Sequence, residues 1–376
     1  MKKVLIVATV VKTHIMQFHI PHMKWLKENN YEVHVCARND YENKSECVIP
    51  YCDCYYDIPF ERNPFDIKNI TAYKHLKKII GINNYDIIHC HTPVGGVLSR
   101  LAARSARKKG TKVIYTAHGF HFYKGAPIKN WILYYPIEKW LSRYTNVLIT
   151  INDEDYNCAI SKGFKAKKIY KVNGVGIDLK KFGPQTQGEK KELRKHYGYK
   201  DEDFILINVA ELNSNKNQVL LINAINKLKD KIPNIKLLLV GTGPLKEQYE
   251  ELVKKLNLEN YVVFLGYRRD VPELMALSDI AVSASKREGL PVNVMEAMAT
   301  GLPLVVTDCR GNRDLVINKE NGYVVGIDDV KKFADSVEEL YKSEELRKKY
   351  SQRSLEFIKH YSLQKVVDEM KKIYEN

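Results

Sequence analysis

The sequence of 376 residues lacks the features of several large protein classes. It has no run of about 18 apolar residues, the length that a membrane-spanning helix needs. The apolar stretch that follows Met1 is too short for a secretory signal and has no small-residue cleavage site, so we expect a first strand there. No helix-turn-helix, RNA-recognition or zinc-finger motif is present, and the basic residues form no dense tract, which argues against a nucleic-acid-binding protein.

Cysteine is sparse and unpaired in pattern. The chain has seven cysteines, an odd number, and only Cys47, Cys52 and Cys54 lie near one another. No second pair completes a zinc-binding spacing, so the sequence predicts no metal site and no disulfide framework. We therefore expect a reduced, cytoplasmic protein.

Acidic residues are few in the first half of the chain. The formal net charge is +15, and nearly all of the excess positive charge precedes Pro184. A one-sided basic domain favours an anionic partner, such as a polyprenyl diphosphate or the inner face of an anionic plasma membrane. A basic surface that only aids solubility is the alternative.

The length and the polar composition of residues 183–189 predict two domains with separate cores. We expect an N-terminal domain over residues 1–183 and a C-terminal domain over residues 184–358. An amphipathic helix from Leu363 to Tyr374 follows, within a tail of residues 359–376. Apolar strand-like segments alternate with helical patterns in both halves, which indicates an α/β fold of Rossmann-like type.

The segment from Asp279 to Asp308 carries the strongest local signal. It is predicted to form a strand (280–283), a loop, a helix (292–300) and a second strand (304–307), with Pro291 at the start of the helix and Gly301 at its end. Glu288 lies in the loop and Glu296 lies in the helix, so both carboxylates can face one small ligand. Carboxylates accept hydrogen bonds from sugar hydroxyls. The free backbone N–H groups near Gly289, Leu290, Pro291 and Val292, at the start of the helix, favour phosphate.

These two glutamates and the sequence around them resemble the signature of retaining GT-B glycosyltransferases of family 4, and the resemblance extends over most of the chain. It implies two Rossmann-like domains with an interdomain cleft, and a C-terminal helix that returns to the first domain. It also implies transfer of a hexose or N-acetylhexosamine from a nucleotide-diphosphate sugar, with UDP as the expected nucleotide, without a metal or other cofactor. In this resemblance Glu288 contacts the transferred sugar and Glu296 holds the ribose.

The resemblance implies further donor-side residues in the second domain. Lys216 matches a family lysine that contacts the diphosphate, whereas Glu211 occupies the place of the usual arginine. Arg310 and Arg313 are candidates for the missing cation, since a diphosphate needs more than one positive partner. The remaining expected donor contacts are Asn213, Gly241, Tyr267 and Arg268.

In the first domain His118 resembles the strand-end histidine that contacts the transferred sugar, and His121 is the alternative. The family's paired glycines after the first strand are replaced here by a segment containing Lys12 and His14, which we interpret either as a substrate loop or as plain surface. His89 and His91 share one face of a strand, so we expect one in the core and the other in the cleft. His89 and His91 are both possible zinc ligands, but no cysteine or carboxylate pattern completes a site.

A basic and aromatic surface is expected to bind the acceptor or a membrane. Arg100, Arg104 and Arg107 are spaced on one face of a helix predicted over residues 97–109. Aromatic and basic residues around Trp131 suit a membrane interface, single-stranded nucleic acid or, in part, core packing. The predicted acceptor or membrane residues are Lys12, His14, His91, Arg100, Arg104 and Trp131.

We therefore predict an enzyme of surface polysaccharide synthesis, such as capsule or exopolysaccharide assembly, whose acceptor is a glycan or a polyprenyl-diphosphate-linked glycan. We expect it in the cytoplasm, peripherally on the inner face of the plasma membrane. Two alternatives remain at this point. One is a non-catalytic glycosyltransferase-like subunit that binds nucleotide without turnover, which Glu211 motivates; the other is a sugar-nucleotide epimerase.

Overall fold

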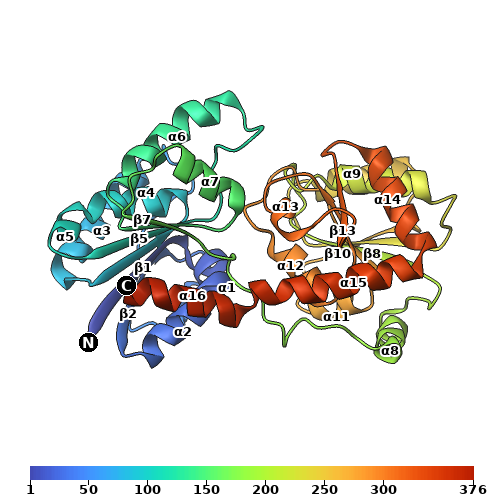
Figure 1. Cartoon of the computed structure of the whole chain (residues 1–376), viewed down its shortest axis with the longest axis horizontal. Helices are drawn as coiled ribbons and strands as arrows, with labels where there is room; N and C mark the ends of the chain where they lie inside the picture. The colour runs from blue at the N-terminus through green and yellow to red at the C-terminus, as the bar shows by residue number, and fades with distance from the viewer. The chain divides into compact units, whose positions relative to one another are not determined.

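The computed structural model describes all residues from 1 to 376 and divides them into two compact units (Figure 1). The first unit contains Met1–Gly176 together with Leu363–Asn376, and the second contains Ile177–Ser362. Each unit holds its own parallel sheet. The sequence placed the boundaries at 183/184 and 358/359, whereas the chain contacts divide the units after Gly176 and after Ser362.

The first unit is built on a seven-stranded parallel sheet with the order β3-β2-β1-β4-β5-β6-β7. Parallel strands that are covered on both faces read as nearly continuous apolar runs, and most of these strands do so. The strands are β1 (Lys2–Val10), β2 (Tyr31–Arg38), β3 (Cys54–Asp57), β4 (Ile87–His91), β5 (Lys112–Ala117), β6 (Val147–Thr150) and β7 (Lys168–Lys171).

Helices cover both faces of this sheet because side chains alternate along each strand. Val4 and Ile6 of β1 belong to one buried cluster, while Leu5 and Val7 belong to a second cluster on the opposite face. The helices of the unit are η1 (Val11–Ile15), α1 (Met16–Phe18), α2 (Ile20–Glu28), η2 (Lys44–Glu46), α3 (Lys68–Asn83), α4 (Pro93–Ala102), α5 (Arg104–Lys108), α6 (Ile128–Ser142), α7 (Asp153–Ser161) and α16 (Leu363–Glu375).

The last helix, α16, lies against the first unit, as the sequence predicted. It runs beside α2 in Figure 1, and the rings of Tyr374 and Trp25 are stacked with their centroids 6.1 Å apart. The Tyr374 hydroxyl also lies 2.7 Å from Nδ1 of the buried His89. The apolar face of α16, which includes Val366 and Met370, completes one of the two cores of the unit.

The second unit is built on a six-stranded parallel sheet with the order β10-β9-β8-β11-β12-β13. Its strands are β8 (Phe204–Val209), β9 (Ile235–Val240), β10 (Val262–Gly266), β11 (Ile280–Ser283), β12 (Leu304–Thr307) and β13 (Gly322–Val325). Its helices are α8 (Gln187–Tyr197), α9 (Gln218–Leu228), α10 (Lys246–Lys255), α11 (Val271–Ala276), α12 (Val292–Ala299), α13 (Asn312–Leu315), α14 (Val330–Lys342), α15 (Glu344–Ile358) and η3 (Lys359–Tyr361).

The predicted strand–loop–helix–strand unit is confirmed in β11, α12 and β12. Pro291 is the residue before the first helical residue, with an extended backbone, rather than the first helical residue itself. Gly301 follows the helix with φ at 79°, the left-handed region that lets a glycine end a helix. The loop between β11 and α12 therefore lies at the carboxyl end of the sheet, the edge at which open α/β sheets bind ligands.

The basic helix predicted over residues 97–109 is wrong in its bounds. Two helices, α4 and α5, meet at Ala103, and their arginines have different environments. Arg100 is buried, Arg104 is exposed, and the Arg107 guanidinium donates to Asn146 at 2.9 Å. These three side chains form no shared basic face.

Candidate functional site

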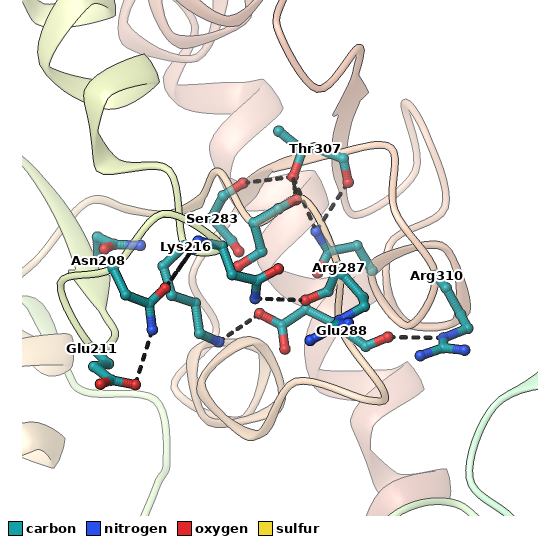
Figure 2. Close-up of polar contacts among 12 residues, drawn as sticks. Asn208, Glu211, Lys216, Ser283, Arg287, Glu288, Thr307 and Arg310 are labelled. Atoms are coloured by element: carbon teal, nitrogen blue, oxygen red, sulfur yellow. Dashed lines mark hydrogen bonds and ion pairs between the residues drawn. The ribbon is translucent and has the colours of Figure 1, made fainter. Parts of the chain in front are cut away.

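The second unit brings three loops together at the carboxyl ends of neighbouring strands (Figure 2). These loops follow β8, β11 and β12, which are adjacent in the sheet. They carry Lys216, Glu288 and Arg310 respectively, residues that are far apart in the sequence. The sheet order therefore assembles the site that the sequence could only suggest residue by residue.

Lys216 and Glu288 form the central ion pair of this site. The ammonium donates to Oε1 of Glu288 at 2.5 Å, and both side chains are largely buried, with 22% and 12% exposed. An ammonium held in this way has further N–H donors, while the second carboxylate oxygen can accept from a hydroxyl. The pair thus offers a donor for phosphate beside an acceptor for a sugar hydroxyl.

Hydrogen bonds to backbone carbonyls hold the loops after β8 and β11 together. The Lys286 N–H donates to the Asn215 carbonyl at 2.8 Å, and the Asn215 amide donates to the Arg287 carbonyl at 3.0 Å. At the base of the loop Thr307 donates its hydroxyl to the Ser285 carbonyl at 2.5 Å. The Lys216–Glu288 distance is therefore set by a bonded network and not by two free loop tips, which favours a preorganised site. The sequence analysis did not identify Asn215, because an asparagine in a polar loop gives no signal of its own.

Glu211 takes part in the hydrogen bonding inside the loop after β8. Its carboxylate accepts from the side-chain Nδ2 of Asn213 at 2.9 Å, and the side-chain Oδ1 of Asn213 accepts from the backbone N–H groups of Asn215 and Lys216. Asn213, predicted as a direct donor contact, thus has both ends of its side chain engaged inside the loop. The glutamate at the expected arginine position orients the segment that carries Lys216.

Arg310 lies beside Glu288 of the central ion pair, as Figure 2 shows. The buried Arg310 donates its Nε–H to the backbone carbonyl of Glu288 at 2.9 Å. Arg313 pairs with Asp308 at 2.9 Å and is 41% exposed. Of the two candidate phosphate partners, the structure places Arg310 at the site.

Glu296 lies on α12 and is largely removed from water. Burial raises the pKa of its carboxyl to about 7, and the positive charge of Lys181 opposes this shift. The helix itself begins at Val292, directly after Gly289, Leu290 and Pro291, with no side chain capping its first N–H groups. Those N–H groups and the Glu296 carboxyl are available to a ligand with an anionic end and hydroxyls.

The other predicted donor contacts differ in their exposure and in the partners they already have. Tyr267 is 75% exposed, so its ring is open to a ligand. Arg268 donates to Asp270, with Nε 2.8 Å from the carboxylate, and this partner holds the pKa of Asp270 well below its usual range. Gly241 has φ at 143°, and a Cβ there would overlap the Ala210 carbonyl, so only glycine allows this turn to approach the loop after β8.

The first unit gathers four histidines at the carboxyl ends of β1, β4 and β5. His14, His91 and His118 were predicted as site residues, and His19 was not, because it reads as part of a helix. His91 Nδ1 lies 3.2 Å from His118 Nε2. Burial lowers the pKa of His118 to about 4, and burial also lowers the pKa values of His14, His19 and His91 well below their usual range. All four imidazoles are therefore neutral at pH 7.

His89, the strand neighbour of His91, is a core residue. Its Nδ1 lies 2.7 Å from the Tyr374 hydroxyl and its Nε2 lies 2.8 Å from the Thr116 hydroxyl. The His121 ring packs against the Tyr134 ring in a tilted arrangement, with the ring centroids 4.7 Å apart. His118 is therefore the strand-end histidine that joins the cluster, and His121 is not part of it.

A cavity of about 510 Å³ opens beside this cluster within the first unit. His14 and Thr13 line it, and its apolar wall includes Val97, Leu133 and Ile137. Volumes of this size are typical of small-molecule sites. Lys12 lies outside the cavity lining: its backbone N–H donates to Asp40 at 2.5 Å and its ammonium lies 5.5 Å from the Tyr41 ring centre.

The prediction that Arg100 faces an acceptor or a membrane is wrong. Its side chain is 1% exposed, pairs with Glu138 at 2.8 Å and lies 3.9 Å above the Tyr115 ring. A buried guanidinium needs such a partner, which Glu138 supplies from α6. Arg104 is exposed, with its guanidinium 4.5 Å from the centre of the Tyr144 ring, and Trp131 packs partly buried against Phe122.

Comparison with known proteins assigns the class of the chain. A family model described as "Glycosyl transferase 4-like" matches residues 3–152, and one described as "Glycosyl transferases group 1" matches residues 189–357. A protein of Bacillus subtilis (strain 168), designated as a glycosyltransferase, EpsD, is 46% identical over 99% of this chain and 96% of its own length. The chain therefore belongs to the group 1 glycosyltransferases and has their GT-B fold.

Two further similarities bear on the site. An Escherichia coli protein named as a UDP-Gal:α-D-GlcNAc-diphosphoundecaprenol α-1,3-galactosyltransferase is 29% identical over 83% of this chain and 81% of its own length. The crystal structure of HepE from Anabaena, in complex with UDP and glucose, superposes with a TM-score of 0.82 at 19% identity and full coverage of both chains. No helix of the present chain has the length and apolar character that crossing a membrane would require.

Proposed function

We propose that this chain is a retaining glycosyltransferase that moves a hexose or N-acetylhexosamine from a UDP-sugar to a polyprenyl-diphosphate-linked glycan in surface polysaccharide synthesis. One observation carries the proposal: the Lys216–Glu288 pair, with Arg310 beside it, at the carboxyl edge of the second sheet. Two cations suit a leaving diphosphate, and a carboxylate suits the hydroxyls of the sugar attached to it. The galactosyltransferase relative, whose name specifies a UDP-linked donor, supports the choice of nucleotide.

The proposed reaction breaks the bond between the sugar C1 and the diphosphate oxygen and forms a bond from the acceptor oxygen to the same face of C1. The acceptor proton passes to the leaving phosphate oxygen, so no protein base is needed. The enzyme then contributes mainly position and charge. Lys216 and Arg310 stabilise the charge that develops on the diphosphate, and Glu288 orients the sugar.

Two further residues complete the proposed donor contacts. Glu296, whose carboxyl sits near the start of α12, accepts hydrogen bonds from the ribose hydroxyls. His118, neutral at pH 7, donates an N–H to a hydroxyl of the transferred sugar. Neither contact requires a metal.

The acceptor assignment rests on the first unit. The cavity there has an apolar wall from α4 and α6, and the exposed outer face of α6 carries Ile128 and Ile132, which are 77% and 72% exposed. An apolar chain can occupy such a cavity, and an exposed apolar helix face beside basic residues suits a membrane interface. The undecaprenyl-linked acceptor in the relative's name has the same chemistry.

The donor is tested by thermal unfolding with UDP, GDP, ADP and their sugar conjugates, followed by circular dichroism. A ligand at about 100 times its Kd stabilises the folded state by about 2.7 kcal/mol. We expect UDP compounds alone to raise the Tm, and the Lys216→Ala variant to lose this shift. An equal response to all nucleotides, or an unchanged shift in Lys216→Ala, contradicts the donor site.

Turnover separates the enzyme from its alternatives. With a synthetic polyprenyl-diphosphate glycan we expect UDP release and a product with the anomeric configuration of the donor. Nucleotide binding without any turnover would indicate a non-catalytic subunit, and conversion of the UDP-sugar without acceptor would indicate an epimerase.

Membrane attachment is tested by sedimentation with vesicles that contain anionic lipid. The double variant Ile128→Glu/Ile132→Glu should lose binding while its UDP-induced Tm shift stays unchanged. Ile82→Glu, at the end of α3 and 66% exposed, is the matched control and should bind as before. Equal binding by all three proteins would contradict docking through α6.

A further inference from the structure

Four imidazoles of the first unit converge on one point. His14 lies in η1, His19 directly precedes α2, His91 ends β4 and His118 follows β5. One ring nitrogen from each lies within 4.8 Å of the corresponding nitrogens of the other three. The rings of His19 and His91 have centroids 3.9 Å apart, and those of His14 and His118 have centroids 5.1 Å apart.

The hydrogen bonding of these rings differs from that of His89 and His34, and the neighbouring His22 also has a buried Nδ1 without a partner. His89 and His34 each have a partner at both ring nitrogens. In the cluster, Nε2 of His14, His19 and His91 is buried and makes no hydrogen bond. Buried polar atoms are normally paired, so three unpaired nitrogens on rings this close together indicate a missing ligand.

The chemistry of this donor set selects the ligand. Four imidazoles without a carboxylate suit Zn²⁺ and related transition metals, whereas Mg²⁺ and Ca²⁺ require oxygen. Zn–N bonds of about 2.0 Å in a tetrahedron place the nitrogens about 3.3 Å apart. Nδ1 of His91 and Nε2 of His118 lie 3.2 Å apart, close to this value, and without an ion one of the two donates a hydrogen bond to the other. The ligand atoms lie within 4.8 Å of one another, so the longest separations must shorten when an ion binds. His14 lies on the short helix η1 and is only partly buried, which leaves it room to move.

We propose that His14, His19, His91 and His118 bind one Zn²⁺ ion in the first unit. A site with four protein ligands is closed, so the ion acts in structure and not as a Lewis acid. It ties the turn after β1 and the start of α2 to the ends of β4 and β5. The sequence pointed away from a metal because His89 and His91 lacked companions nearby in the chain; the companions come from other strand ends.

The ion also fixes the tautomer of His118, a consequence that rests on the proposed function. A histidine that binds a metal through one nitrogen carries its proton on the other. His118 would then always present an N–H to the sugar. Metal binding itself is measured without the reaction, so the zinc site and the transferase activity fail or succeed independently.

The test uses the full-length chain stripped of metal by a chelator and then titrated with Zn²⁺ alone. We expect one bound ion per chain by elemental analysis, and a rise in the Tm of the first unit. Trp25, Trp131 and Trp140, the three tryptophans of the chain, all lie in that unit, so their fluorescence reports it. Substitution of Co²⁺ should give the intense visible spectrum of a tetrahedral site, which needs no variant.

Matched variants locate the ion. His19→Gln and His91→Gln should each lose the stoichiometric ion and the Tm rise. His22→Gln, a buried neighbour outside the cluster, and the exposed His75→Gln should keep both. A weak octahedral Co²⁺ spectrum, less than one ion per two chains at micromolar Zn²⁺, or equal binding by His19→Gln would overturn the proposal.

Discussion

The Glu296→Gln substitution should stabilise the second unit above neutral pH while it weakens nucleotide binding. Burial raises the pKa of Glu296 from 4.5 to about 7, so the folded state disfavours its ionised form. The folded protein then binds this proton more tightly than the unfolded chain does. Its contribution to stability is fully present below pH 4.5 and is lost as the pH rises through 7. Glutamine has the same shape and no charge, so it avoids the loss.

The size of the effect follows from the two pKa values. Linkage with pKa 4.5 unfolded and 7 folded gives a loss of about 2.5 kcal/mol between pH 5 and pH 8. The difference in the free energy of unfolding between the wild type and Glu296→Gln isolates the contribution of this carboxyl. The buried histidines have lowered pKa values, which give the opposite pH dependence, and they lie in the other unit.

The assay must report the second unit, which contains no tryptophan. Native-state hydrogen exchange of the buried strands β11 and β12, measured by mass spectrometry at pH 5 to 8, provides the free energy of unfolding there. A difference between the two proteins that is flat across this range would refute the raised pKa. A variant that binds UDP as tightly as the wild type would refute the ribose contact.

Substitutions at three other residues test the contacts of Lys216, Glu211 and Arg100. Lys216→Ala should lower kcat about 10²- to 10³-fold, as loss of one charge-stabilising donor does elsewhere, with little change in circular dichroism; wild-type turnover would exclude its role at the diphosphate. Glu211→Ala should raise the KM for the UDP-sugar about three- to tenfold, because Asn213 loses its hydrogen-bond acceptor, and Glu211→Gln should restore the wild-type KM. Equal kinetics for the wild type and both variants would show that Glu211 is not a positioning residue. Arg100→Met should destabilise the first unit by about 3–5 kcal/mol in urea unfolding followed by tryptophan fluorescence, because Glu138 is left as an unpaired charge, and a loss below about 1 kcal/mol would contradict that reasoning.

Much of the fold could be predicted because its signals are local. The β11–α12–β12 segment has strand runs, a proline and a glycine at the helix ends, and the structure places these elements within a residue of the prediction. The C-terminal helix was predicted from its amphipathic pattern and from family resemblance, and its apolar face packs as expected. The basic helix failed because periodicity cannot tell a charged surface residue from one with a buried partner. Arg100 and Glu138 are separated by two elements, and only their packing shows the pair.

The sequence by itself determined the α/β class and the strand, loop and helix that carry Glu288 and Glu296, since each of these depends on neighbours within about ten residues; Lys216, Glu288 and Glu296 were predicted as site residues from their match to the family pattern. The tertiary structure alone decided which of these residues meet. Parallel strands bring loops from distant parts of the chain to one edge, and this places Lys216 against Glu288 and the Arg310 guanidinium against the Glu288 backbone carbonyl. The same geometry brings His14, His19, His91 and His118 together from three strand ends. No spacing in the sequence encodes that cluster, because strand order and not chain order sets the distance between strand ends.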